Sequence, residues 1–160
     1  MRIVVMGPSD SGKALIGAAV AASLRSPFID GDDLLVSVAA RFAPADVPAA
    51  WLDGIAWALR HPAVVVACPL LARSGRDRIR SRVSDVIFVE LVAAASPVIR
   101  TRVPRRDRAA RAAKLDQPPA RVEPLGSDEA GIRVADDADL GSVVQRIVDL
   151  LVRAPAQSLR

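Results

Sequence analysis

The sequence predicts an α/β protein in which helices cover both faces of a parallel β-sheet. Apolar runs of strand length alternate with helical segments along the chain, and one of these runs, 63–68, is apolar without interruption. The first run also leads through a glycine-framed turn into an apolar helix. An unalternated apolar strand belongs in a parallel sheet that is covered on both sides. Right-handed crossovers between such strands place the helices on both faces, which gives three layers.

The first half of the chain begins with a β-branched strand. The expected elements are, in order, a strand at 2–6, a helix at about 13–24, a strand at 28–30, an acidic turn at 31–33, a helix at 34–42 and a helix at about 49–60. Two prolines within 43–48 separate the last two helices, because proline breaks a helix interior. Apolar residues at helical spacing are expected to pack the 49–60 helix on the sheet, with Trp51 and Trp57 among them.

The second half continues the alternation of strands and helices. The expected elements are a strand at 63–68, a loop at 69–75, an arginine-rich helix at 77–83, a strand at 86–91, a helix at 96–103, an arginine-rich helical stretch to about 115, a proline-rich loop at 116–126, a strand at 131–135 and a helix capped by Asp139. The last residues, 154–160, are expected to be frayed. Neither a repeat nor a linker divides the chain, so a single domain is expected over 1–160.

A phosphate-binding loop is predicted directly after the first strand. The run Gly7-Pro8-Ser9-Asp10-Ser11-Gly12-Lys13 fits the pattern G-x-x-x-x-G-K between a strand and a helix, the context that this pattern requires. The glycines let backbone N–H groups point inward, the helix start adds positive potential, and the lysine ammonium meets the outer phosphates. The alternative is an ordinary strand–turn–helix with glycines at this spacing by chance. The predicted nucleotide-binding residues of the loop are Gly7, Ser9, Asp10, Ser11, Gly12, Lys13 and Ala14.

Two positions of the loop depart from the usual pattern. Ala14 stands where a Ser or Thr hydroxyl normally holds Mg²⁺, and Asp10 puts a carboxylate where phosphate charge should settle unless its side chain turns outward. The pattern therefore indicates nucleotide binding more strongly than it indicates nucleotide turnover.

Three loops are expected to converge at the carboxyl ends of the strands, where ligands bind in open α/β sheets. These loops are 7–13, 30–33 and 68–76. Asp30, Asp32 and Asp33 follow an apolar strand there, so we expect metal or substrate contacts, with helix capping and a solvated turn as the alternative. The arginines between 73 and 80 could reach a phosphate or a carboxylate substrate, and one or two of them are expected to do so.

Composition excludes several functional classes. The 160 residues include 51% hydrophobic residues, enough for a core, and no apolar stretch approaches the length of a membrane span. The net charge is +4, but no helix-turn-helix, zinc knuckle or aromatic RNA-binding pattern accompanies the basic run 100–111, so nucleic acid is not expected as a partner. Met1 leads straight into the first strand without a signal peptide, and the single Cys68 fits a reducing compartment; both favour the cytoplasm.

The order of motifs resembles one family along nearly the whole chain. After the phosphate-binding loop come Pro27-Phe28-Ile29-Asp30-Gly31-Asp32-Asp33-Leu34, then Trp51-Leu52-Asp53, then Arg76-Asp77-Arg78. With the later Leu115-Asp116-Gln117 and Glu123-Pro124, this order is similar to bacterial gluconokinases of the shikimate-kinase-like group. The 27–34 motif is the most specific part of the resemblance.

The resemblance implies a fold, an activity and a set of site residues. It implies a three-layer P-loop NTPase fold with a five-stranded parallel sheet and a short lid at about 100–126, and MgATP-dependent phosphorylation of D-gluconate. Lys13 would hold the β- and γ-phosphates, and Asp30 would help to place the metal through water. Asp32 would hold or deprotonate the substrate hydroxyl and Arg76 would contact the substrate. Arg102 and Arg106 would close over the phosphates.

Several family positions carry apolar residues here. The polar groups expected after the 27–34 motif and in the 68–76 loop are replaced by residues such as Leu35, Pro69, Ala72 and Gly75. Two main hypotheses remain, a gluconokinase-like kinase for gluconate or a related sugar acid, and a nucleotide-binding relative without phosphotransfer. A basic nucleic-acid-associated P-loop protein is a third and weaker one. The 100–111 run is either a lid that closes on nucleotide or an exposed basic helix, and family members are often dimers, which makes a homodimer an expectation from the resemblance alone.

Overall fold

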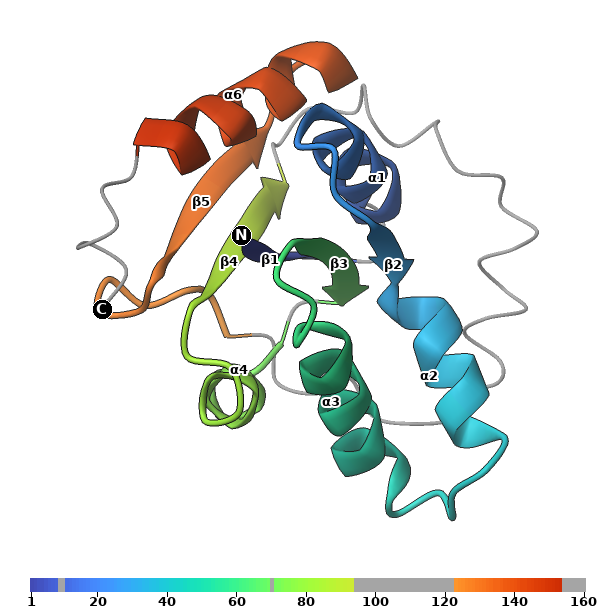
Figure 1. Ribbon diagram of the computed structural model, residues 1–160. Coiled ribbons are helices and arrows are strands. Elements are labelled where there is room, and N and C mark those ends of the chain that lie inside the picture. Colours follow the sequence, from blue (N-terminus) through green and yellow to red (C-terminus); the bar gives the residue numbers. More distant parts are fainter. Residues whose placement is uncertain (9–10, 70, 94–122, 154–160) are drawn as a thin grey trace.

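The computed structural model describes residues 1–8, 11–69, 71–93 and 123–153 of the chain. The described part contains a five-stranded sheet in the order β2-β3-β1-β4-β5, in which every neighbouring pair is parallel (Figure 1). The strands are β1 (Arg2–Gly7), β2 (Phe28–Asp30), β3 (Val64–Pro69), β4 (Val86–Ala93) and β5 (Gly131–Asp136). The predicted five-stranded parallel sheet is therefore confirmed.

Helices lie on both faces of this sheet, so the three-layer prediction is confirmed as well (Figure 1). They are α1 (Lys13–Ser23), α2 (Gly31–Ala39), α3 (Val47–Ala58), α4 (Arg73–Arg80) and α6 (Leu140–Arg153). Alternate residues of a strand point to opposite faces, and β1 shows the result. Ile3 belongs to the core that includes α1 and α6, whereas Val4 belongs to the core that includes α3 and α4.

Two helices begin three or four residues earlier than the sequence predicts. α2 begins at Gly31 instead of 34, because the Asp30 carboxylate accepts the Asp32 N–H at 2.9 Å and caps the helix before the acidic residues. α4 begins at Arg73 instead of 77, and there the Arg73 N–H donates to a carboxylate oxygen of Glu123 at 2.8 Å. The cap of α2 is local, but the partner of α4 lies 50 residues away, which no local pattern reveals.

The two tryptophans of α3 differ in their surroundings. Trp51 is buried as expected, but the prediction that Trp57 packs on the sheet is wrong, since its side chain is 72% exposed. Six residues of helix correspond to a rotation of about 240°, so the two side chains cannot share one face. The face of α3 that reaches the core carries Trp51 and Ile55.

Some predicted elements lie outside the described residues. These are the helix at 96–103, the arginine-rich stretch to about 115, most of the lid expected at 100–126 and the end at 154–160. Residues 123–126 are described and form neither helix nor strand. The single domain over 1–160 stays a prediction. None of the helices in the described ranges has both the length and the apolar character that crossing a membrane requires.

Candidate functional site

The turn after β1 needs both of its motif glycines. A Cβ atom on Gly7 would lie 2.5 Å from the Ser11 hydroxyl oxygen and 3.1 Å from the Cβ atom of Leu91. Gly12 has a φ of 66°, in the left-handed region that side-chain-bearing residues rarely adopt. Ser11 is buried, and both its N–H and its hydroxyl donate to the Pro8 carbonyl, at 3.1 and 2.9 Å. The chain therefore turns tightly from β1 into α1.

The start of α1 has the features of an anion-binding helix terminus. Gly12 supplies no side-chain cap, and the first turn carries no acidic residue. The first helical hydrogen bond runs from the Ile16 N–H to the Gly12 carbonyl at 2.9 Å, so the N–H groups of residues 13–15 have no acceptor inside the helix. Together with the helix dipole, these N–H groups favour a negatively charged ligand at this point.

Lys13 and Asp32, the two residues predicted to be catalytic, lie together. The Lys13 side chain is 9% exposed, and its Nζ atom is 3.8 Å from Oδ2 of Asp32, whose side chain is 29% exposed. The ammonium and the carboxylate thus face each other beside the amino-terminal ends of α1 and α2. A phosphate held at the start of α1 would meet the ammonium directly, with a carboxylate within reach of it.

The register of the sheet brings the three predicted loops to one edge. Gly7 is paired with Pro69, and Asp30 with Ala67, so β1, β2 and β3 end side by side. Gly31 packs so closely on β3 that an added Cβ would lie 2.5 Å from the Ala67 carbonyl oxygen. The predicted convergence of these loops is confirmed for the residues that the structure describes.

Cys68 ends the buried part of β3 beside this site. Burial raises the pKa of its thiol far above the ordinary value; nearby Lys13 lowers that pKa, and nearby Asp32 and Asp30 raise it, to a smaller extent. A thiol reacts as the thiolate, so Cys68 should be inert despite its position next to a charged loop.

We expect the native protein to react with a disulfide reagent such as DTNB roughly 100-fold more slowly than the same chain unfolded in guanidinium chloride. Because Cys68 is the single cysteine of the chain, the absorbance change reports on it alone. Rapid and complete labelling of the native protein would contradict the burial that the structure gives it.

The residues at the site fit magnesium bound through water and phosphate oxygens. Mg²⁺ keeps several waters and is bound in kinase sites by one or two carboxylates together with substrate phosphates. Asp32 supplies a carboxylate beside Lys13, and the Asp30 carboxylate accepts the Asp32 N–H. Ala14, in the first turn of α1, supplies no hydroxyl. Within the described ranges no group of three or more His, Cys, Asp or Glu side chains could hold a metal ion.

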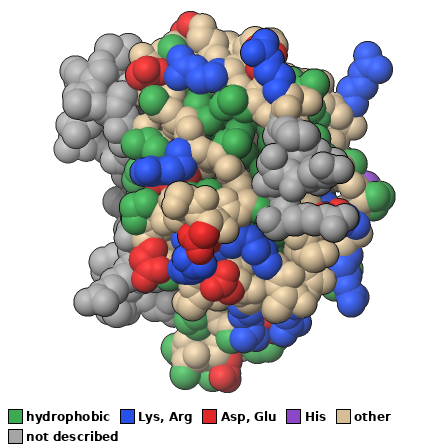
Figure 2. All heavy atoms as spheres, turned by 90° about the vertical axis from the view of Figure 1, so that its left-hand side faces the viewer, with side chains coloured by type: hydrophobic (Ala, Val, Ile, Leu, Met, Phe, Trp, Pro, Cys, Tyr) green, Lys and Arg blue, Asp and Glu red, His purple; other side chains and the backbone are tan. Residues whose placement is uncertain are grey.

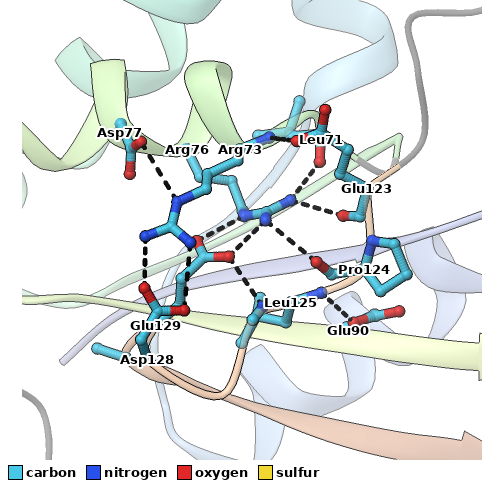
Figure 3. A network of polar contacts seen from close by, with 12 residues as sticks. Leu71, Arg73, Arg76, Asp77, Glu90, Glu123, Pro124, Leu125, Asp128 and Glu129 are labelled. Carbon is cyan, nitrogen blue, oxygen red and sulfur yellow. Dashed lines mark hydrogen bonds and ion pairs between the residues drawn. The ribbon is translucent and has the colours of Figure 1, made fainter.

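Arg76 has different surroundings from those expected of a substrate ligand. It is completely buried, and all five of its N–H donors are used (Figure 3). Its Nε and Nη2 atoms donate to Glu129 at 2.8 and 2.5 Å, and the remaining donors reach the carbonyl oxygens of Leu71, Glu123 and Pro124. Contact with a substrate would require Arg76 to exchange one of these bonds, and that role stays a prediction.

Glu129 is the centre of this network and was not among the predicted site residues. The carboxylate is 2% exposed and also accepts from Arg80 at 2.7 Å and from the Gly126 N–H at 2.9 Å. The Arg76 hydrogen bond is the largest cause that lowers the pKa of Glu129, to about 2. Nearby, Glu90 accepts from the Leu125 N–H at 2.7 Å. The sequence feature that could have indicated buried polar contacts here is Glu90, a glutamate inside the apolar run of β4.

The other arginines of α4 also pair with acidic residues of the chain. Arg73 pairs with Asp128 at 2.6 Å and Arg78 with Asp53 at 2.8 Å, both at the surface. On the face shown in Figure 2, basic and acidic side chains lie side by side. The described arginines of α4 are therefore engaged in internal ion pairs, and none is shown to reach a substrate. Ser9, Asp10, Arg102 and Arg106 lie outside the described residues.

Comparison with solved structures places this geometry among known proteins. A sugar kinase from Janibacter sp. is 25% identical, with a TM-score of 0.68, and the match covers 99% of this chain and 98% of that one. A gluconokinase from Sinorhizobium meliloti is 28% identical, with a TM-score of 0.67 and coverage of 95% and 91%. A shikimate kinase from Aquifex aeolicus shares the fold at 17% identity, with a TM-score of 0.60 and coverage of 95% and 96%.

No protein-family model matches the chain, and no curated protein sequence matches it significantly. The likeness is therefore carried by the fold and by identities of 25–28% that extend over almost the full length of both partners. The chain therefore has the fold of the P-loop small-molecule kinases, with a sequence that has diverged from theirs.

Proposed function

We propose that this protein is an ATP-dependent kinase that transfers the γ-phosphoryl group of ATP to a hydroxyl of D-gluconate or a related sugar acid. The observation that carries the proposal is the Lys13 ammonium 3.8 Å from the Asp32 carboxylate, beside a glycine turn and an uncapped helix start. Two of the similar structures are named as a sugar kinase and a gluconokinase, which supports the choice of acceptor.

The phosphate groups of ATP are assigned to the loop between β1 and α1. Its backbone N–H groups and the Lys13 ammonium neutralise the charge of the β- and γ-phosphates, with Gly7, Ser9, Asp10, Ser11, Gly12 and Ala14 as the lining residues. Arg102 and Arg106 stay proposed phosphate contacts. Magnesium, placed through water by Asp30, would neutralise further charge on the transferred group.

Asp32 is assigned to the acceptor. Its carboxylate takes the proton of the attacking hydroxyl, whose oxygen forms a bond to the γ-phosphorus while the bond from that phosphorus to the β–γ bridging oxygen breaks. The products are the phosphate ester and ADP. Phosphoryl transfer depends mostly on positioning and charge neutralisation, which a few well-placed groups can supply.

The second candidate is a nucleotide-binding relative without phosphotransfer. Two observations favour it: Ala14 offers no oxygen to magnesium, and the internal bonds of Arg76 leave no donor for an acceptor. A site that lacks hydrogen bonds to its substrate discriminates poorly and positions it poorly. Both candidates require ATP binding at the same loop.

Two measurements separate these candidates. Isothermal titration with ATP, with and without Mg²⁺, tests the nucleotide site, and no binding would end both candidates. A coupled assay of ADP release then tests phosphoryl transfer, with gluconate, shikimate, related acids and their neutral polyol analogues as acceptors. ATP binding without ADP release on any acceptor would favour the second candidate, whereas saturable release with a sugar acid supports the kinase.

Ala14→Ser is expected to raise magnesium-dependent turnover by about tenfold or more, because a direct metal ligand stabilises charge in the transition state. The measurement is kcat for ADP release as a function of Mg²⁺ concentration. Ala14→Cys is the matched control, since a thiol has nearly the size of the hydroxyl group but is a poor magnesium ligand. An equal gain in both variants would show that side-chain size, and not the metal, was responsible.

A further inference from the structure

The peptide group between Gly31 and Asp32 is held at both of its ends. On one side, the Asp32 N–H donates to Oδ1 of Asp30 at 2.9 Å. On the other side, the Gly31 carbonyl oxygen accepts the indole N–H of Trp51 at 2.8 Å, in a buried hydrogen bond that reaches across 20 residues. Because the peptide group is planar, two bonds at opposite ends fix the orientation of the whole unit.

Gly31, which contributes the carbonyl of this peptide, packs closely on β3. Gly31 is the first residue of α2, and an added Cβ would lie 2.5 Å from the Ala67 carbonyl oxygen and 3.1 Å from the Cβ atom of Cys68. The start of α2 is thus pressed against the end of β3. Trp51, on α3, has its side chain in the core cluster that also includes residues of β3, and its indole N–H reaches the Gly31 carbonyl oxygen.

The clamped peptide leads directly to the Asp32 side chain. Its nitrogen bonds to the Cα atom of Asp32, so the orientation of this plane, together with the φ and χ1 angles of Asp32, sets the direction in which the carboxylate leaves the backbone. That carboxylate lies 3.8 Å from the Lys13 ammonium. A rotation of the peptide would carry it away from the position in which it can serve a hydroxyl beside the transferred phosphoryl group, and small misplacements of this kind are costly in catalysis.

We infer that Trp51 is a positioning residue, whose indole N–H holds the Gly31–Asp32 peptide and thereby aims the Asp32 carboxylate at the phosphoryl-transfer site. The inference rests on the proposed function, in which Asp32 receives the proton of the acceptor hydroxyl. Trp51 itself touches neither nucleotide nor acceptor in this scheme. Loss of the indole N–H should therefore lower kcat. The affinity for ATP should stay nearly the same, because ATP is held by the loop after β1, which Trp51 does not contact in this scheme.

The chain offers a matched pair of substitutions for the test. Trp51→Phe keeps an aromatic ring in the core and removes the N–H, whereas Trp57→Phe makes the same chemical change on the same helix at an exposed side chain. We expect Trp51→Phe to lower kcat by about 10- to 100-fold, with the Kd for ATP changed less than about twofold. Trp57→Phe should leave kcat, Kd and the melting temperature as in the wild type.

Two readouts distinguish positioning from a general loss of stability. Activity is measured at least 15 °C below the melting temperature of each variant, so that every sample is fully folded; an unchanged kcat for folded Trp51→Phe would overturn the inference. Amide hydrogen exchange of the Asp32 N–H is measured without any substrate and should become faster in Trp51→Phe only. If the Asp32 N–H exchanged at the same rate in Trp51→Phe and in Trp57→Phe, the inference would also be overturned. A wild-type protein that releases no ADP would refute the proposed function. In that case the exchange rates alone would decide whether Trp51 holds the Gly31–Asp32 peptide.

Discussion

Replacing Lys13 by methionine is expected to lower kcat/KM for ADP release by about 10²- to 10³-fold, the usual cost of removing one preorganised charge partner from a transition state. The substitution keeps the length and the apolar stem of the side chain but removes the ammonium. The Asp32 carboxylate, 3.8 Å away, loses that cationic neighbour at the same time. ATP affinity should fall as well, because the phosphates would meet only backbone N–H groups.

Lys13→Arg is the informative partner of that variant. It restores the positive charge, but its planar guanidinium is larger than an ammonium and binds in a different geometry. If charge alone mattered, the arginine variant would recover most of the ATP affinity measured by titration. Wild-type turnover in Lys13→Met would show that phosphoryl transfer, if it occurs, uses a different site.

Replacing Arg76 by alanine is expected to cost about 3–5 kcal/mol of the free energy of unfolding, because it leaves a buried carboxylate without its main partner. The side chains of Arg76 and Glu129 are 1% and 2% exposed, and three carbonyl oxygens lose a donor as well. Chemical denaturation monitored by circular dichroism measures the loss. Arg78→Ala, which removes a half-exposed ion pair with Asp53 on the same helix, should cost no more than about 1 kcal/mol.

A double variant tests the cause of that loss. Arg76→Met combined with Glu129→Leu removes both charges, and replacement of a buried ion pair by apolar residues is often neutral. It should therefore be clearly more stable than Arg76→Ala. Equal costs for Arg76→Ala and Arg78→Ala would contradict the role that the structure gives to this network.

The same ion pair predicts a difference in acid stability. The pKa of Glu129 is about 2 in the folded protein and near 4.5 when the chain is unfolded, so its stabilisation is present above pH 4.5 and is lost as the pH falls toward 2. Arg76→Ala removes most of the cause of the low pKa, so its free energy of unfolding should depend less on pH in this window than that of the wild type.

The fold was predictable because its signals are local. The apolar run of β3 and the turn after β1 each identify their own element, and the order of strands and helices then determines the layers. The same holds for the convergence of the loops at Gly7, Asp30 and Pro69, which follows from the parallel arrangement of the strands.

The site was less predictable where contacts connect distant residues. Arg76 matches the family pattern, but its N–H groups donate to Glu129 and to carbonyl oxygens about 50 residues away in the sequence. Nothing in the sequence around position 76 indicates these partners. Trp51 was expected in the core, yet its bond to Gly31 depends on how α2 and α3 pack. Such contacts depend on tertiary structure. Sequence spacing can therefore predict the helix or strand in which a residue lies, but not the residue to which it bonds.

The central position of β1 has a consequence for the synthesis of the chain. Arg2 is in register with Val64 on one side and with Val86 on the other, so both partners of the first strand are translated later. At about 5–20 residues per second, this apolar strand waits roughly 3–12 s for the first of them. Until then the backbone groups of β1 have no sheet partner, and its apolar side chains have no core to enter.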